Sequence, residues 1–230
     1  MVAALGRAKQ LGFPLDTYNH VWALRNEIWI RCEAGQLNHA KAVAGQMIEQ
    51  AERHGFDYWQ RFGALEQCAI DARLLLVSAD RDPDVLSNHI TTMTTIQDAL
   101  RSIGVEAYRP LNDGLIGQLL IASDRRDEAR DRLDTALSIT ADNEQGFYDA
   151  ELLRLRAHTL SEPVARAAEF DAARDLARRQ GAPLFELRAA LDDFELRGSP
   201  ARERLRDAAS RLAGDSRLPE LERTRVLLRR

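Results

Sequence analysis

The stretch Ala51-Glu52-Arg53-His54-Gly55-Phe56 carries the signal that decides the fold. A glycine followed by an apolar residue is typical of a helix C-terminus, because glycine adopts the left-handed conformation there and the apolar side chain packs back on the last turn. The recurrence of this order along the chain indicates repeated helical units. Further copies place glycine at Gly12, Gly104 and Gly181, with a weaker copy at Gly146.

A second break falls inside each repeat. Serine or aspartate at these positions can accept backbone N–H bonds, and proline suits the first turn of the helix that follows. Each repeat is therefore predicted to be a helix, a short turn, a second helix and a glycine stop. The breaks lie at Gly35, 79–83, 123–125, 161–163 and 198–200.

The segments between the breaks have helical periodicity. Leu86, Ile90, Met93 and Ile96 step by three or four residues, and no run of β-branched residues alternates with period two. The sequence therefore predicts an all-α fold of about twelve helices. Their expected ranges are 1–11, 15–34, 37–54, 57–78, 84–103, 107–122, 125–140, 147–160, 164–180, 183–197, 200–213 and 219–229.

Small and large residues are arranged so that paired helices can approach closely. Gly117, Leu120, Ala129, Leu133 and Ala136 resemble the tetratricopeptide repeat pattern, in which small residues at a helix crossing receive large neighbours. The resemblance implies a right-handed superhelix of stacked antiparallel helix pairs, with the first helix of each pair on the concave side. We expect one such domain over 1–230, with repeats at roughly 13–55, 56–104, 105–146, 147–181 and 182–214 and a capping helix at 219–229.

Composition excludes several classes of protein. The chain has 230 residues, 45% hydrophobic and 30% charged, which excludes intrinsic disorder, and no apolar run is long enough for a membrane span. No secretory leader is expected at the N-terminus. A net charge of −4 gives no reason to expect nucleic acid. The two cysteines, Cys32 and Cys68, are expected to be buried thiols in a reducing, cytoplasmic compartment.

Catalytic and metal-binding patterns are not found. Lys9 and Lys41 are the two lysines, and neither completes a phosphate-binding loop. The histidines are scattered without zinc spacing, and there is no Cys-x-x-Cys. The pair Asp192-Asp193 is expected on a solvated helix face. The arginines of 202–211 are expected on a solvated helix with salt bridges to neighbouring carboxylates. We therefore predict no enzymatic activity, no catalytic residues, no metal and no cofactor.

Longer stretches resemble a known class of protein. FYDAELLRLRA (147–157), LARRQGA (176–182), ELRAA (186–190) and PELERTRVLL (219–228) form an ordered series. The series is similar to the C-terminal helical repeats of large bacterial signalling ATPases that carry an adenylate/guanylate cyclase or a LuxR-type output domain, and looks more like the cyclase–ATPase arrangement of actinobacteria. The resemblance implies a regulatory, non-catalytic region, either a fragment or a stand-alone relative. Its implied partner is a protein or peptide, including the ATPase or cyclase part of its own parent.

Aromatic and charged residues give the candidate site. Tyr18, Trp22, Arg25 and Trp29 share one helix face, since they are three or four residues apart. Two interpretations stay open here: these rings pack between repeats, or they form a groove that grips a peptide. The candidate groove residues are Trp22, Arg25, Trp29, Arg61, Gln118, Arg154 and His158.

Two other functions remain as alternatives to the interaction or sensor region. A pocket between repeats would take a small-molecule inducer. An uncapped end, around Val2, Leu5 and Leu11, would support self-association, for example as a homodimer.

Overall fold

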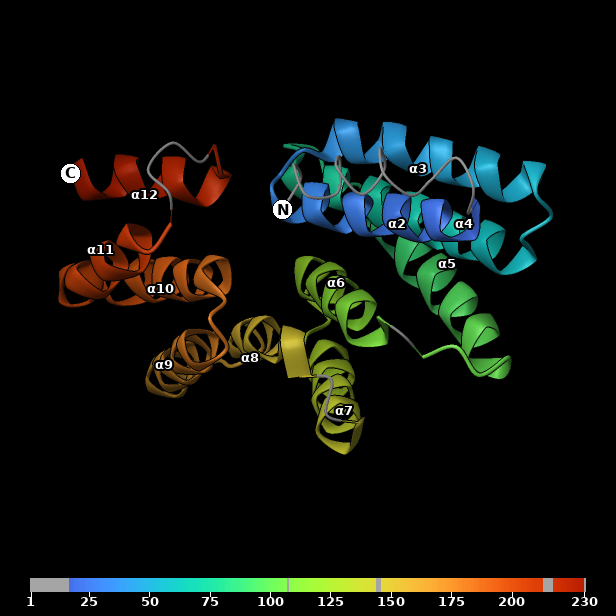
Figure 1. The fold of residues 1–230 in the computed structure, drawn as a ribbon. Helices are drawn as coiled ribbons and strands as arrows, with labels where there is room; N and C mark the ends of the chain where they lie inside the picture. The colour runs from blue at the N-terminus through green and yellow to red at the C-terminus, as the bar shows by residue number, and fades with distance from the viewer. Residues whose placement is uncertain (1–16, 107, 144–145, 213–216, 230) are drawn as a thin grey trace. The chain divides into compact units, whose positions relative to one another are not determined.

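The computed structural model describes residues 17–106, 108–143, 146–212 and 217–229. These residues form eleven α-helices, labelled α2 to α12, and two short 3₁₀ segments, and they contain no strand (Figure 1). The all-α fold predicted from the sequence is confirmed. Within the described ranges, no helix combines the length and the apolar character that crossing a bilayer requires.

The chain divides into two compact units, Met1–Ala107 and Tyr108–Arg230. The division follows Gly104, where the second predicted repeat ends. In the first unit each helix packs against the next, and α2 also packs against α4. Its helices are α2 (Thr17–Glu33), α3 (Leu37–Arg53), α4 (Asp57–Val77) and α5 (Pro83–Ser102).

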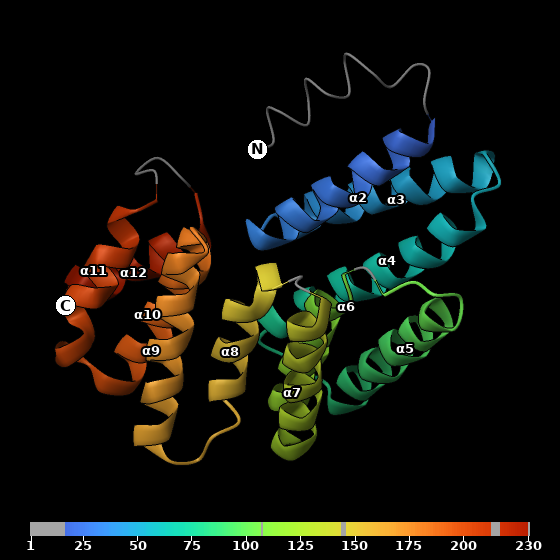
Figure 2. The same ribbon diagram turned by 60° about the horizontal axis from the view of Figure 1, so that its bottom comes forward.

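The second unit continues the same scheme of consecutive helices. Each α-helix packs on its successor, while α8 also packs on α6 and α10, and α10 on α12 (Figure 2). The helices are α6 (Arg109–Ala122), α7 (Arg126–Asn143), α8 (Asp149–Ala157), α9 (Pro163–Arg179), α10 (Pro183–Arg197), α11 (Arg202–Ser210) and α12 (Pro219–Arg229), with 3₁₀ segments at Gly146–Tyr148 and Ser199–Ala201.

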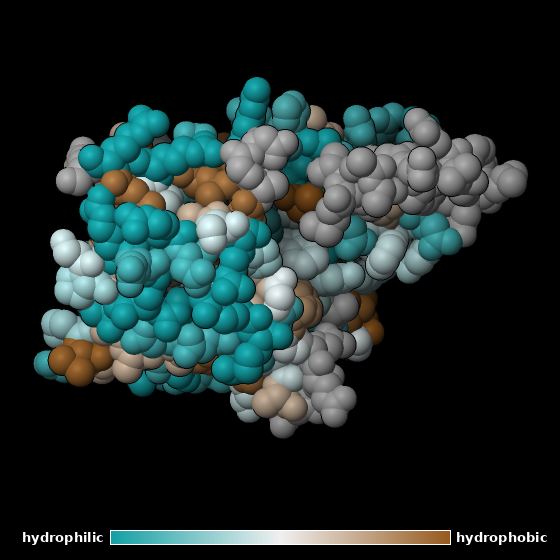
Figure 3. Space-filling model, turned by 60° about the vertical axis from the view of Figure 1, so that its left-hand side comes forward, coloured by the Kyte–Doolittle hydropathy of each residue, from teal (hydrophilic) through white to brown (hydrophobic). Residues whose placement is uncertain are grey.

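The final helix covers the end of this unit. Leu221 of α12 joins a buried cluster with Leu187 and Leu191 of α10 and with Leu205 and Ala208 of α11. This contact fits the capping helix expected at 219–229. The face over α9 to α12 is largely hydrophilic, with small apolar patches (Figure 3).

Most predicted helices lie within three residues of the observed ones. The helix predicted at 1–11 lies outside the described residues. The one predicted at 147–160 starts as a 3₁₀ turn and ends at Ala157, and the one at 200–213 likewise starts in 3₁₀ form and ends at Ser210.

The glycine stops have the expected conformation. Gly55, Gly104 and Gly181 have φ of +66°, +81° and +64°. After Gly55, the N–H of Phe56 donates to the carbonyl of Ala51 at 2.9 Å, and the N–H of Gly55 donates to Glu52. These two bonds define the Schellman motif. The same pair of bonds closes the turns after Gly35, Gly104 and Gly181, and Asp124, with φ of +56°, takes the glycine position after α6.

The helix stop predicted at Gly146 was wrong. Gly146 was predicted as a weaker helix stop, but it begins the 3₁₀ segment before α8 and is not among the glycines with positive φ. Gly12 lies outside the described residues.

Close helix approach is seen where the tetratricopeptide-like pattern was clearest. A Cβ added to Gly117 would meet Leu133 Cδ2 at 3.0 Å, and Leu133 itself is fully buried. Ala129 and Ala136 are also fully buried. The small residues on α6 and α7 therefore allow the two backbones to approach, and Leu133 fills the space between them.

Two glycine substitutions should change stability in opposite directions. Gly55→Ala forces a Cβ into the left-handed conformation and should lower the free energy of unfolding by about 1 kcal/mol. Gly45→Ala should raise it by about 0.5–1 kcal/mol, because Gly45 is exposed inside α3 and a Cβ there would meet nothing within 4 Å. Urea denaturation of both variants measures the two changes; changes of the same sign would contradict this account of the turn.

Candidate functional site

The residues predicted to form one groove fall into separate groups. Trp22, Arg25 and Trp29 lie on α2 and Arg61 on α4, all in the first unit. The second unit holds Gln118 on α6, Arg154 on α8 and His158 directly after α8. Each unit's group is described by itself.

The first unit exposes two aromatic rings on α2, which we call the aromatic surface. Tyr18 is 50% exposed and Trp22 is 47% exposed, and they are one helical turn apart. The Tyr18 ring lies 5.6 Å from each of the rings of Phe56 and Trp59, measured between centroids. Tyr18 is thus fixed against the start of α4, while a large part of both rings on α2 faces solvent.

The rings of α4 belong to the core of the unit instead. Trp59 and Phe62 are 3% and 1% exposed, and their centroids are 5.9 Å apart in an edge-to-face contact. Packing between repeats, one of the two interpretations of the aromatic residues, therefore describes Trp59 and Phe62. Tyr18 and Trp22 are the rings that remain accessible on this face.

Arg25 does not present its guanidinium to solvent. Its side chain is fully buried, Nε donates to Glu66 Oε1 at 3.2 Å, and the guanidinium carbon lies 5.4 Å from the centroid of the Phe62 ring. A buried charge needs a partner of opposite sign, and Glu66 on α4 supplies it. Of the other residues predicted in the first unit, Arg61 is exposed and Trp29 is half-buried.

In the second unit, Arg154 and His158 belong to a network of charged side chains that joins α8, α10 and α12. Arg154 donates two hydrogen bonds to Glu151, with N–O distances of 2.8 and 2.9 Å, and a third to Asp192. His158 Nε2 lies 2.8 Å from Asp192 Oδ2. Arg188 on α10 continues the network, contacting Glu151 at 3.4 Å and Glu220 of α12 at 2.7 Å. We call these six residues the ionic network.

The network lowers the pKa of two of its carboxylates, Glu151 and Asp192. Burial by itself raises the pKa of Asp192, but the positive charge of Arg154 and the hydrogen bond from His158 outweigh burial and lower it from 3.8 to about 2. Burial also acts to raise the pKa of Glu151, and Arg154 and Arg188 together lower it below its usual value. The carboxylates of Glu151 and Asp192 are thus paired with Arg154, Arg188 and His158.

The solvated interpretation of Asp192-Asp193 was wrong. Their side chains are 12% and 1% exposed, and Asp193 pairs with Arg197 and with Arg204 of α11. The physical reason is the position of α10, which packs against α8, α9, α11 and α12 and has little free surface. Arg204 lies on the helix that was predicted to carry salt bridges, and its partner is Asp193 of the neighbouring helix α10.

Sequence reasoning missed most of the ionic network. Glu151 and Arg154 are three residues apart, a spacing that could have indicated their ion pair on α8. The contacts of the network between different helices could not be recognised from residue spacing. Gln118 is half-buried on α6 and belongs to neither the aromatic surface nor the ionic network.

The two thiols have different surroundings. Burial raises the pKa of Cys32 to about 11, and its charged neighbours are Arg73, Glu66, Glu33 and Arg25. Cys68 Sγ lies 3.3 Å from Nδ1 of His89 on α5, a contact between residues 21 positions apart that spacing could not indicate. Burial and then the charge of Asp71 raise the pKa of Cys68. No group of three His, Cys, Asp or Glu side chains suited to a metal occurs among the described residues.

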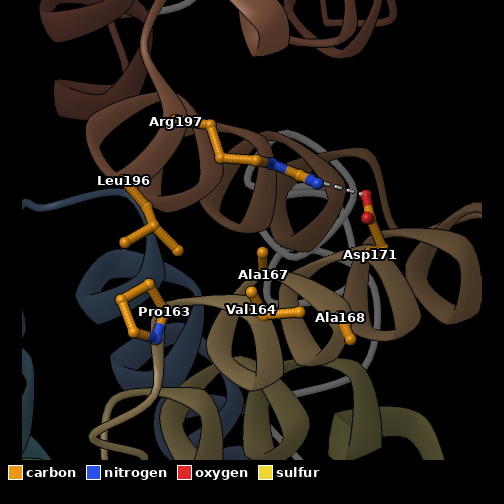
Figure 4. Close-up of a pocket in the computed structure, with 7 residues that line it drawn as sticks. All are labelled: Pro163, Val164, Ala167, Ala168, Asp171, Leu196 and Arg197. Atoms are coloured by element: carbon orange, nitrogen blue, oxygen red, sulfur yellow. Dashed lines mark hydrogen bonds and ion pairs between the residues drawn. The ribbon is translucent and has the colours of Figure 1, made fainter.

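A shallow groove of about 450 Å³ lies between the start of α9 and the end of α10. Its walls are mainly apolar, and an ion pair between Asp171 and Arg197, 3.0 Å long, closes one side (Figure 4). The lining residues are Pro163, Val164, Ala167, Ala168, Asp171, Leu196 and Arg197.

No known family, no curated protein and no solved structure matches this chain. A function for this chain is therefore inferred from the geometry of its two units.

Replacing Asp192 by asparagine should change the acid sensitivity of the protein. A carboxylate with a lowered pKa in the folded state contributes stability that is present above its unfolded pKa near 3.8 and is lost as pH falls toward about 2. The stability difference between the wild type and Asp192→Asn should therefore shrink by about 2 kcal/mol between pH 5 and pH 2. Urea denaturation across this pH range measures it. Asp80→Asn, at an exposed turn, is the matched control, and a constant difference for Asp192→Asn would refute the account.

Proposed function

We propose that this chain is a non-catalytic protein-interaction region that binds a protein or peptide through the aromatic surface on α2. The observation that carries the proposal is the exposure of Tyr18 and Trp22, 50% and 47%, next to a fully packed core. Rings held on a helix lose little conformational freedom on binding, and tryptophan and tyrosine are frequent in binding hot spots.

The distribution of aromatic residues supports this location. The chain has three tryptophans, and all lie within residues 22–59. Trp59 anchors the start of α4 and Tyr18 packs on it, so the exposed rings rest on a firm base. In the regulatory role implied by the resemblance, the partner is the ATPase or cyclase part of a signalling protein. A bound partner would favour one arrangement of the stacked helices over others.

The proposal predicts that the exposed ring of Trp22 contributes much of the binding free energy. Peptides selected by display on the wild-type chain should lose at least about tenfold in affinity for Trp22→Ala, since truncating a hot-spot residue costs about 2 kcal/mol or more. Circular dichroism should show an unchanged helix content, because the ring is half exposed.

Phe147→Ala is the matched control, because Phe147 is a 40% exposed ring in the second unit. It should leave the affinity of the selected peptides unchanged. Equal affinity of the peptides for Trp22→Ala and wild type, or selection of no peptide at all, would count against the proposal.

The groove between α9 and α10 favours a second candidate, a small-molecule binding function. Its volume of about 450 Å³ lies in the range of small-ligand sites, and its apolar walls carry a single ion pair. The groove lies between successive helix pairs, where an inducer was expected from the sequence.

A bulky side chain in the groove tests this second candidate. Ala168 is exposed on the groove wall, so Ala168→Trp should fill the groove without disturbing the core. A metabolite that raises the melting temperature of the wild type should lose this effect with Ala168→Trp and keep it with Ala172→Trp, an exposed position one turn further along α9. An equal loss with both variants would argue against the groove.

A further inference from the structure

Further accessible rings lie next to the aromatic surface, in the turn between α3 and α4. The Tyr18 ring contacts the ring of Phe56, which lies in this turn, at 5.6 Å between centroids. The imidazole of His54 stacks on Phe56, with 5.9 Å between centroids and 28° between the ring planes. His54 is exposed and Phe56 is half-buried. Solvent therefore reaches aromatic rings both on α2 and in the turn that follows α3.

Carboxylates flank this turn along the chain. Glu52 lies in the last turn of α3 and Asp57 begins α4, and both side chains are exposed. Among the described residues neither of these carboxylates has an ion-pair partner, because Arg53 pairs with Glu49 instead, at 2.6 Å. Arg61, exposed one helical turn after Asp57, offsets one of the two charges. One carboxylate in excess therefore remains next to these rings.

The charge of the whole first unit has the same sign. Residues 1–107 contain 13 aspartates and glutamates and 10 lysines and arginines, so this unit carries −3 of the net charge of −4. A surface of this sign attracts a cationic partner and repels an anionic one. The faces of aromatic rings also carry a negative partial charge that attracts cations. Rings and carboxylates together therefore favour a cationic ligand.

The protein itself holds two arginines with the same combination of groups. The guanidinium carbon of Arg25 lies 5.4 Å from the centroid of the Phe62 ring, and its Nε donates to Glu66. Arg188 lies 5.9 Å from the centroid of the Phe185 ring and pairs with a carboxylate of α12. A planar guanidinium suits this environment, because it stacks on rings and pairs with carboxylates, which an ammonium group does less well.

We propose that the aromatic surface binds an arginine side chain of the protein partner. The guanidinium lies over the ring faces of Tyr18 and Trp22, and the alkyl stem of the arginine covers apolar area of these rings. Glu52 and Asp57 attract the cation toward them. This inference rests on the proposed function, since it names the chemistry that the partner presents to the same surface.

Peptides selected on the wild-type chain test the inference through the arginine itself. Random linear peptides are displayed, and those whose affinity falls with Trp22→Ala are kept. We expect these peptides to contain arginine. Replacing that arginine by glutamine should weaken binding about threefold to tenfold, and replacing it by lysine should cause a smaller loss.

The outcome separates this inference from the proposed function. Peptides that bind through Trp22 and keep full affinity without arginine would overturn the inference and leave the proposed function intact. Selection of no peptide that depends on Trp22 would overturn both.

Two substitutions of Trp22 distinguish a cation contact from a purely apolar one. Trp22→Phe keeps a ring face, whereas Trp22→Leu keeps apolar area without a ring. Arginine peptides should bind Trp22→Phe several-fold more tightly than Trp22→Leu, and this difference should disappear for the glutamine peptides, as a double-mutant cycle requires of a direct contact. The same difference with both kinds of peptide would contradict a contact between the guanidinium and the ring. Circular dichroism checks that both variants are folded.

Charge variants examine the two carboxylates. Glu52→Gln and Asp57→Asn should each weaken binding of the arginine peptides about twofold, mainly through slower association, and the loss should shrink at high salt. Asp80→Asn, which removes an exposed carboxylate between α4 and α5, is the matched control and should change the affinity much less. An equal effect of all three variants would overturn the role given to Glu52 and Asp57.

Discussion

The fold depends on one backbone constraint, the left-handed residue that ends a helix and turns the chain back. At Gly35, Gly55 and Gly181 the same two hydrogen bonds satisfy carbonyls of the last helical turn and reverse the chain. Because the reversal takes few residues, the next helix must lie beside the one just completed. Asp124 adopts the same left-handed backbone conformation although it is not a glycine, so the turn keeps its geometry where glycine is absent. The packing of α2 on α3, of α3 on α4, of α6 on α7 and of α9 on α10 follows from this repetition.

The packing of the helices against one another determines which charged side chains are buried. A helix such as α10, packed on four others, has little free surface, although its sequence carries charged residues throughout. Asp193 and Glu186 are therefore buried and Asp192 is mostly buried, and each has an arginine partner from the same or a neighbouring helix. Leaving one such group unpaired would cost several kcal/mol, on the order of 3–5. The arginine-rich composition of the second unit is used for cross-helix pairing.

The helices could be predicted from the sequence because their signals are local. The helices predicted at 183–197 and 219–229 have those bounds in the structure, and the turn at Gly55 was predicted from the glycine and the apolar residue that follows it. The ionic network and the Cys68–His89 contact could not be predicted from the sequence, because they depend on which side of one helix faces another. Arg25 shows the same limit: its spacing put it on a face with Trp22, but the packing of α2 on α4 buried it against Glu66.

These contacts also decide where binding free energy is available. A ligand that engaged Arg154 or Asp192 would have to replace hydrogen bonds that the chain already makes, and the exchange would gain little. Binding at Tyr18 and Trp22 does not require hydrogen bonds to be replaced. Covering an exposed ring removes apolar area from water, which stabilises the complex by about 25 cal/mol per Å² of area buried. Ion pairs therefore hold the helices of the second unit in place, while the exposed rings of α2 form the surface through which we propose that a partner binds.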